Sequence, residues 1–177
     1  MLVENEEFEF FWHGPFSQWY PSIFVVNHVT YGCAEQYMMA SKAKLFNDIE
    51  ILNKILSVKI VKPNDAKELQ ELGRQIHNFD YATWVKYRYT IVLKASMEKY
   101  IQNKELKELL LSTGLKTFVE ASPYDKVWGI GLGVNNPNVY NRSKWEGLNL
   151  LGQALTQTRE NIKIFEYNNL SNEKQYE

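Results

Sequence analysis

The sequence has a single cysteine and almost no net charge, and each of these facts excludes a class of protein. One cysteine, Cys33, rules out a disulfide within the chain and leaves no cysteine cluster to hold zinc, so we expect a reducing compartment. Twenty Lys and Arg residues against 21 Asp and Glu give a net charge of −1. The broad basic field that holds long duplex DNA or anionic lipid regardless of sequence is therefore absent.

Long apolar runs are missing as well. No segment approaches the roughly 18 apolar residues of a membrane span, and the opening MLVENEEFEFFWHG lacks the basic start and apolar stretch of a signal peptide. We therefore expect a cytoplasmic protein without membrane contact. What the sequence does contain is 45% hydrophobic residues, 14% of the chain being aromatic, which is enough for a core and for rings that line a pocket.

The order of the patterns predicts an α+β fold, a mostly α-helical single domain with a small β-sheet. We place the domain over residues 1–177, with its core at about 8–165 and a frayed polar tail at 168–177. Short extended pieces with turns are expected over 8–31, and a strand over 116–121. Apolar residues at 3–4 spacing predict helices over 34–47, 48–58, a segment after Pro63, 83–103, a short stretch ending at Gly114, and 145–164. We expect the helix over 83–103 to be central and buried.

Glu35 and Lys42 are the first candidates for chemistry. They lie seven residues apart, nearly two helical turns, and so project from one face of the predicted helix over 34–47. A carboxylate and an amine that face one aromatic-walled space perturb each other's protonation, and desolvation lowers the lysine pKa toward nucleophilic use. The alternative is a solvated ion pair on an outer face.

Trp84 and Arg88 are the second candidates, an i, i+4 pair within the most apolar helix. An arginine there needs a partner for its charge, and phosphate is one possibility. The alternative is a structural ion pair with an acid of the protein, or a guanidinium that reaches water. Arg74 is a weaker candidate for the same two roles, phosphate binding or a structural ion pair.

Glu120, Ser122 and Asp125 fall at the end of the predicted strand and in the loop after it, where side chains most often serve a site. Two neighbouring carboxylates suit glycosidic chemistry, in which one protonates a leaving group and the other stabilises an oxocarbenium ion or orients water. The alternative is a pair of turn-forming acids. Trp128 follows and is able either to stack on a flat base or to enter the core.

Two other kinds of site find no support. The glycines of Gly129-Ile130-Gly131-Leu132-Gly133 have the wrong spacing for a dinucleotide-binding loop, and no βαβ unit precedes them. The three histidines are too far apart in sequence to suggest metal ligands, so we expect no metal.

The order of these segments along the chain resembles the NADAR domain, known also from the YbiA-like proteins. The resemblance runs from about Phe10 to Arg159, and its most specific block contains Glu120, Asp125, Trp128 and Gly129. Its segments are FSQWYPSIF, YGCAEQYMMASKA, ELGRQI, the Trp84–Arg88 helix, LLSTG, FVEASPYDKVWGIGL and KWEGLNLLGQALTQTR. The chain departs from the family pattern at Gln18, where Asn is usual, and at Gln36, where His is common.

The resemblance implies an enzyme that breaks N-glycosidic bonds without a cofactor. Members are associated with ADP-ribose on guanine in nucleic acid and with phosphoribosylamino-pyrimidine intermediates of riboflavin synthesis, so the expected partner is a nucleotide-like small molecule or a modified guanine. The mechanism implied for the ADP-ribosyl members uses a lysine Schiff base, which maps to Lys42. The implied catalytic residues are Lys42, Glu35, Glu120 and Asp125, and the implied substrate-binding residues are Trp84, Arg88, Trp128, Gly129, Arg74 and Ser122.

One alternative function uses the same residues differently. A non-catalytic module that holds NAD or ADP-ribose as a signal has no need of catalytic carboxylates. The presence of Lys42, Glu35, Glu120 and Asp125 together favours an enzyme, whereas a helical scaffold protein accounts for the apolar stripes but not for these polar residues.

Overall fold

The chain forms two compact units in the computed structural model, which describes residues 7–173. The helical unit comprises His13–Leu106. The strand unit combines the N-terminal stretch up to Trp12 with the segment from Lys107 onward. None of the helices in the described part of the chain is long and apolar enough to cross a membrane.

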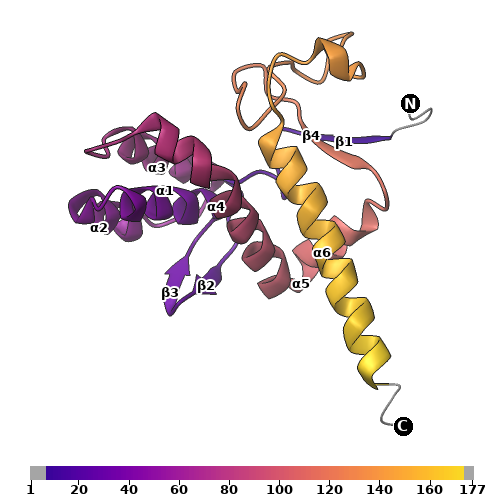
Figure 1. Cartoon of the computed structure of the whole chain (residues 1–177), viewed down its shortest axis with the longest axis horizontal. Coiled ribbons are helices and arrows are strands. Elements are labelled where there is room, and N and C mark those ends of the chain that lie inside the picture. The colour runs from indigo at the N-terminus through magenta and orange to yellow at the C-terminus, as the bar shows by residue number, and fades with distance from the viewer. Residues whose placement is uncertain (1–6, 174–177) are drawn as a thin grey trace. The chain divides into compact units, whose positions relative to one another are not determined.

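Helix α1 (Ala34–Leu45) is the centre of the helical unit. It packs against α2 (Ile49–Ser57), α3 (Ala66–Arg74) and α4 (Tyr81–Gln102), which surround it in Figure 1. Close packing on several sides is possible because α1 carries small residues where neighbours approach, and Ala40 and Ala43 are fully buried. Aspartates begin two of the helices: the Asp48 carboxylate accepts from Ile51 N at 3.0 Å, and the Asp80 carboxylate accepts from Thr83 N at 2.7 Å.

A tight hairpin completes the helical unit. Strands β2 (Phe24–Val26) and β3 (Val29–Tyr31) pair antiparallel through the two-residue turn Asn27-His28, in which both residues have positive φ, 49° and 65°. Two such residues in a two-residue loop give the turn whose twist matches that of paired strands. The predicted helices over 34–47, 48–58 and after Pro63, where a 3-10 turn (Pro63–Asp65) precedes α3, are confirmed.

Helix α4 differs from the expectation that it would be buried all round. One stripe of it is buried, and the rest faces solvent: Val85, Tyr87 and Ile101 are 39%, 40% and 48% exposed. The apolar residues of α4 on its other sides misled the prediction, because single exposed aromatic and aliphatic side chains are normal on protein surfaces. The buried stripe is Trp84, Arg88, Val92, Ala95, Ser96, Lys99 and Tyr100.

In the strand unit, β1 (Phe8–Phe11) and β4 (Thr117–Glu120) form a parallel pair in which Phe8 lies opposite Thr117 and Phe11 opposite Glu120. Helix α6 (Leu150–Glu173) packs along β4 (Figure 1). Helix α5 (Lys104–Ser112) spans the point where the chain passes between the units, and a 3-10 turn (Arg142–Lys144) lies in the long loop before α6. The apolar core of this loop and strand is Val119, Ala121, Ile130, Leu132 and Val139.

The last helix begins later and ends later than predicted. Leu148 N and Asn149 N donate to Lys126 O at 2.9 Å and Gly129 O at 3.0 Å, so the backbone before Leu150 binds the 126–129 loop instead of continuing a helix. Asn149 also has a φ of 52°, which an α-helix does not allow. Beyond Ile164 no Gly or Pro stops the helix, and it runs past Asn168 to Glu173, while residues 174–177 lie outside the described residues.

Glycine at 152 is required for the contact between α6 and β4. A Cβ there would lie 2.2 Å from Phe118 O, and backbone cannot yield as a flexible side chain does. We expect Gly152→Ala to lower the free energy of unfolding by about 3 kcal/mol, measured by urea denaturation. Gly133→Ala is the matched control, because its Cβ would meet nothing closer than 3.9 Å. Equal free energies of unfolding for the two variants would contradict the close approach of Gly152 to the Phe118 carbonyl.

Candidate active site

The amine of Lys42 lies against two aromatic rings of the helical unit. Its Nζ is 4.5 Å from the centroid of the Phe79 ring and 5.5 Å from that of Trp84. It donates a hydrogen bond to Gly73 O at 2.7 Å, at the end of α3. Ring faces within about 6 Å attract a cation and also exclude water from it. The alternative of a solvated pair on an outer face is therefore wrong for Lys42.

Burial shifts the protonation of Lys42 in the direction that nucleophilic use requires. Loss of water around the ammonium is the largest cause and lowers the pKa of Lys42 below the ordinary lysine value. The charge of Glu35 opposes this shift, and the charge of Arg74 adds to it. Glu35, which we predicted on the same helix face, thus acts on the Lys42 amine electrostatically, and so does Arg74, which itself donates to Gln70 Oε1 at 3.0 Å.

Glu35 is held at the start of α1 by a loop that is itself anchored from α4. Its side chain is 4% exposed, and its backbone N–H donates to Gln18 O at 3.0 Å. The buried ammonium of Lys99 donates to Pro15 O at 2.6 Å and Ser17 O at 3.0 Å. Desolvation lowers the pKa of Lys99 to about 7. The backbone carbonyls of residues 15–18 are thus held by the Lys99 ammonium of α4 and by the first turn of α1.

Arg88 lies one helical turn beyond Trp84 on the buried stripe of α4. The residue is only 7% exposed, yet among residues 7–173 its side chain forms no hydrogen bond or ion pair. A guanidinium is always charged, and none of the Arg88 nitrogens is among the fully buried side-chain atoms that lack a partner, so the group at the end of this buried stem reaches water. The predicted alternative of an ion pair with an acid of the protein is therefore wrong in this structure.

Glu120 ends β4, and the amide of Asn149 holds its backbone. Glu120 N donates to Asn149 Oδ1 at 3.0 Å, and Asn149 Nδ2 donates to Phe118 O at 3.0 Å. A single buried side chain thereby pairs with β4 as a neighbouring strand would. On the other side, Glu120 O accepts from Ile130 N at 3.0 Å. These hydrogen bonds of its backbone fix the position of Glu120 at the end of β4.

Ser122 and Asp125 shape the loop that follows β4. Asp125 Oδ1 accepts from Val127 N at 2.8 Å and from Trp128 N at 2.7 Å, and Ser122 Oγ accepts from Tyr124 N at 3.3 Å. These are the turn-forming bonds that the sequence left open as an alternative. They occupy one carboxylate oxygen of Asp125, so a structural role coexists with any chemical one.

Trp128 and Gly129 continue this loop. Trp128 is partly buried, and a Cβ at Gly129 would lie 2.8 Å from Glu120 O and 2.9 Å from Asp125 O. Because Gly129 has no side chain, the loop is able to fold back on the end of β4. This structural role does not depend on contact with a substrate.

The candidate residues form two groups, one in each unit. The helical unit holds Glu35, Lys42, Arg74, Trp84 and Arg88, and the strand unit holds Glu120, Ser122, Asp125, Trp128 and Gly129. Sequence reasoning missed Phe79, Lys99 and Asn149. Lys99 was detectable, because the 3–4 spacing through Trp84 and Arg88 continues to it, and Asn149 lies within the quoted family segment KWEGLNLLG. No signal pointed to Phe79, which precedes α4 in an irregular loop.

Comparison with known proteins decides the family. The chain matches the NADAR domain over residues 9–163, a range that includes the candidate residues of both units. The chain belongs to the NADAR family. The fold and family that the sequence predicted are thereby confirmed, and NADAR relatives show how far the likeness extends.

Two relatives and one solved structure are similar to this NADAR protein. An N-glycosidase of Acanthamoeba polyphaga mimivirus is 39% identical, over 89% of this chain and 98% of the relative. A riboflavin biosynthesis protein of Vibrio vulnificus is 27% identical, over 85% of this chain and 36% of the relative. The NMR structure of the E. coli protein YbiA superimposes with a TM-score of 0.73 at 25% identity, covering 93% of this chain and 90% of YbiA.

Proposed function

We propose that this protein is an N-glycosidase, a hydrolase that cleaves the bond between a phosphorylated ribose and a base-like amine. The observation that carries the proposal is the Lys42 amine, desolvated against the Phe79 and Trp84 rings with a lowered pKa. An amine of this kind is a nucleophile rather than a surface charge. The mimivirus relative, 39% identical, is named an N-glycosidase, which supports the same activity.

In the proposed reaction, the free amine of Lys42 attacks the anomeric carbon and forms a C–N bond as the bond to the base breaks. Glu120 or Asp125 gives its proton to the leaving nitrogen. The carboxylate left behind takes the proton that the attached nitrogen loses and passes it to the ring oxygen as the bond from C1 to that oxygen breaks. This leaves an imine on Lys42, and water adds to the imine and releases the free sugar. Covalent capture divides one difficult displacement into two easier steps. Glu35, buried on the same helix face, favours the return of the proton to the amine after release.

The substrate is bound at its two ends in this proposal. Trp84 and Trp128 contact the flat base, and Arg88 and Arg74 bind phosphate through charge-assisted hydrogen bonds. Arg88 supports this assignment most strongly, because its largely buried side chain forms no hydrogen bond or ion pair within residues 7–173, which leaves its guanidinium open to an anionic ligand. Ser122 and Gly129 line the substrate through the loop after β4. No cofactor or metal is needed for these steps.

Two substrates share this chemistry, ADP-ribose on a guanine of nucleic acid and a phosphoribosylamino-pyrimidine of riboflavin synthesis. We expect purified protein, incubated with each in parallel, to release the base of one of them, detected by mass spectrometry. Lys42→Ala is the negative control. If neither base is released while calorimetry shows ADP-ribose binding, the protein is a binding module and the proposed activity is wrong.

The acid that protonates the leaving nitrogen is identified by paired variants. Asp125→Asn keeps an Oδ1 that accepts from Val127 N and Trp128 N, so it removes the ionisable carboxyl group but not the turn. We expect turnover to fall about 10²–10⁴-fold in either Asp125→Asn or Glu120→Gln, the range typical of a lost general acid. Melting temperatures serve as the control for folding. Wild-type turnover in Asp125→Asn would remove that carboxylate from the mechanism.

A further inference from the structure

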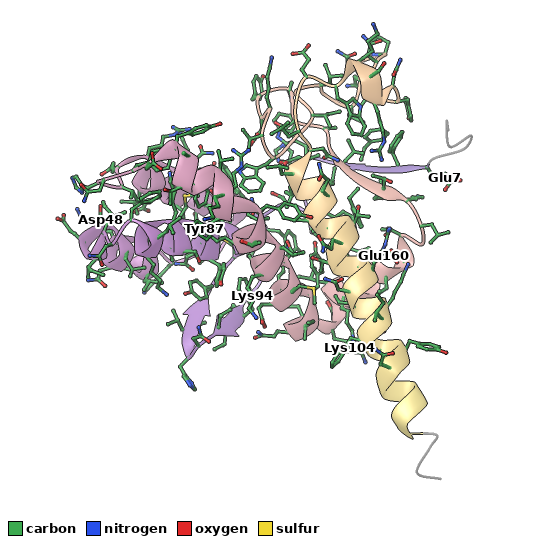
Figure 2. The ribbon with its side chains drawn as sticks, viewed as in Figure 1. Glu7, Asp48, Tyr87, Lys94, Lys104 and Glu160 are labelled. Atoms are coloured by element: carbon green, nitrogen blue, oxygen red, sulfur yellow. The ribbon has the colours of Figure 1, made fainter. Side chains whose placement is uncertain are left out.

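A cavity lies in the helical unit, between the β2–β3 hairpin, α1 and α4. Its volume is about 440 Å³. Three tyrosine rings and three polar side chains give it its character: Tyr31, Tyr37, Tyr87, Asn27, Ser41 and Lys44. We refer to it as the tyrosine cavity. Figure 2 labels Tyr87 on α4, the helix that packs against α1.

The tyrosine cavity is distinct from the surroundings of Lys42. Successive residues of an α-helix are about 100° apart, so Lys44 lies about 200° round α1 from Lys42. Tyr37 and Ser41 fall within roughly 60° of Lys44 on that other side, whereas Glu35 lies close to Lys42. One helix therefore carries two separate sets of functional groups on opposite sides.

The walls of the tyrosine cavity combine flat rings with positive charge. The Tyr31 and Tyr37 rings meet edge to face at 5.0 Å, and Tyr31 stacks on Phe24 at 5.8 Å, which fixes its orientation. Lys44 Nζ donates to the Tyr31 hydroxyl at 3.4 Å, and Lys86, which does not line the cavity, has its Nζ 5.4 Å from the Tyr87 ring. None of the residues that line the cavity is acidic. Aromatic faces beside an unopposed ammonium suit a ligand that joins a flat ring to an anion.

We propose that the tyrosine cavity binds a nucleotide, with its base against the exposed Tyr87 ring and its phosphate at Lys44. Asn27 and Ser41 supply donors and acceptors for the edge of the base. The nucleotide is either free or part of a single strand of nucleic acid, since both present the same base and phosphate. The proposal does not depend on N-glycosidase activity, because it concerns binding on the other side of α1.

The test is a calorimetric titration of the full chain with adenosine monophosphate and with the single-stranded pentamer of deoxyadenylate, at low salt. We expect Tyr87→Ala and Lys44→Ala each to weaken binding about tenfold, in line with the loss of one stacked ring or one phosphate contact. Tyr81→Ala and Lys54→Ala, an exposed tyrosine of α4 and an exposed lysine of α2 that do not line the cavity, leave it unchanged. Tighter binding of the pentamer identifies a strand, and equal binding identifies a free nucleotide.

Arg88→Met separates this site from the proposed active site. We expect nucleotide binding that depends on Tyr87 and Lys44 to persist in Arg88→Met. Binding that disappears in Arg88→Met and survives in Tyr87→Ala belongs to the active site and overturns the proposal. The proposal is also overturned if neither adenosine monophosphate nor the pentamer binds at millimolar concentration, even where the protein releases base from its substrate. Circular dichroism confirms that each variant is folded.

Discussion

Lys42→Ala forms no borohydride-trapped sugar adduct, and its kcat/KM falls at least about 10³-fold, as expected when a nucleophile is removed. Borohydride reduces the imine between Lys42 and the opened sugar to a stable amine, so the adduct is seen as a mass increase on the wild-type chain. The loss is large because no other amine in the described helical unit is placed against both Phe79 and Trp84. Intact-protein mass spectrometry and initial rates measure the two effects.

Lys54→Ala is the matched control for this experiment. Lys54 is 51% exposed on α2 and pairs with Glu50 at 2.7 Å, so its removal tests only the loss of a surface amine. We expect the Lys54→Ala variant to form the borohydride-trapped sugar adduct and to have the kcat/KM of the wild type. Trapping that persists in Lys42→Ala would show that another residue is the nucleophile.

The pH profile gives an independent check on Lys42. Attack requires the neutral amine, so kcat/KM rises with pH as Lys42 loses its proton. Because burial lowers the pKa of Lys42, the midpoint of this rise lies below the ordinary lysine value of about 10.4. Glu35→Gln removes the charge that raises the pKa of Lys42 and moves the midpoint to still lower pH. A midpoint at or above the ordinary value would contradict the desolvated amine.

Arg88→Met raises KM for the phosphorylated substrate about 100-fold while the melting temperature stays the same or rises. Hydrogen bonds to a charged partner contribute about 1.5–3 kcal/mol, and about 2.7 kcal/mol corresponds to two orders of magnitude in affinity. We expect no loss of stability, because Arg88 forms no hydrogen bond or ion pair within residues 7–173 and methionine retains much of the apolar stem. Initial rates and thermal denaturation of one preparation measure both quantities.

A structural arginine gives the reverse result. If Arg88 supports only the fold, the melting temperature of Arg88→Met falls and its KM does not change. Lys94→Met, on the same helix, removes a half-exposed cation that pairs with Glu98 and leaves both quantities near their wild-type values.

Local patterns were sufficient for the helical part of the site. The seven-residue spacing of Glu35 and Lys42 placed both on one side of α1, and the electrostatic effect of Glu35 on Lys42 agrees with that placement. The i, i+4 spacing of Trp84 and Arg88 placed both on the buried stripe of α4. Spacing is informative here because the 3.6-residue period of a helix fixes which side chains share a face.

Spacing was uninformative where the chain is irregular. Asp125 and Ser122 were open to a catalytic or a turn-forming interpretation, and only the loop geometry showed that their oxygens accept backbone N–H groups. The start of α6 was misplaced for the same reason. The backbone at Leu148 and Asn149 is bonded to the 126–129 loop, and such a bond leaves no periodic mark in the sequence.

The sequence by itself determined the helices of the helical unit, the shared faces of Glu35 with Lys42 and of Trp84 with Arg88, and the NADAR family, because side-chain periodicity and the order of segments are local properties of the chain. Only the tertiary structure decided that Phe79 and Gly73 meet the Lys42 amine, that Arg88 is buried without a partner among residues 7–173, and that Asn149 pairs with β4. These depend on which surfaces pack together, and burial and desolvation arise from that packing rather than from any one segment.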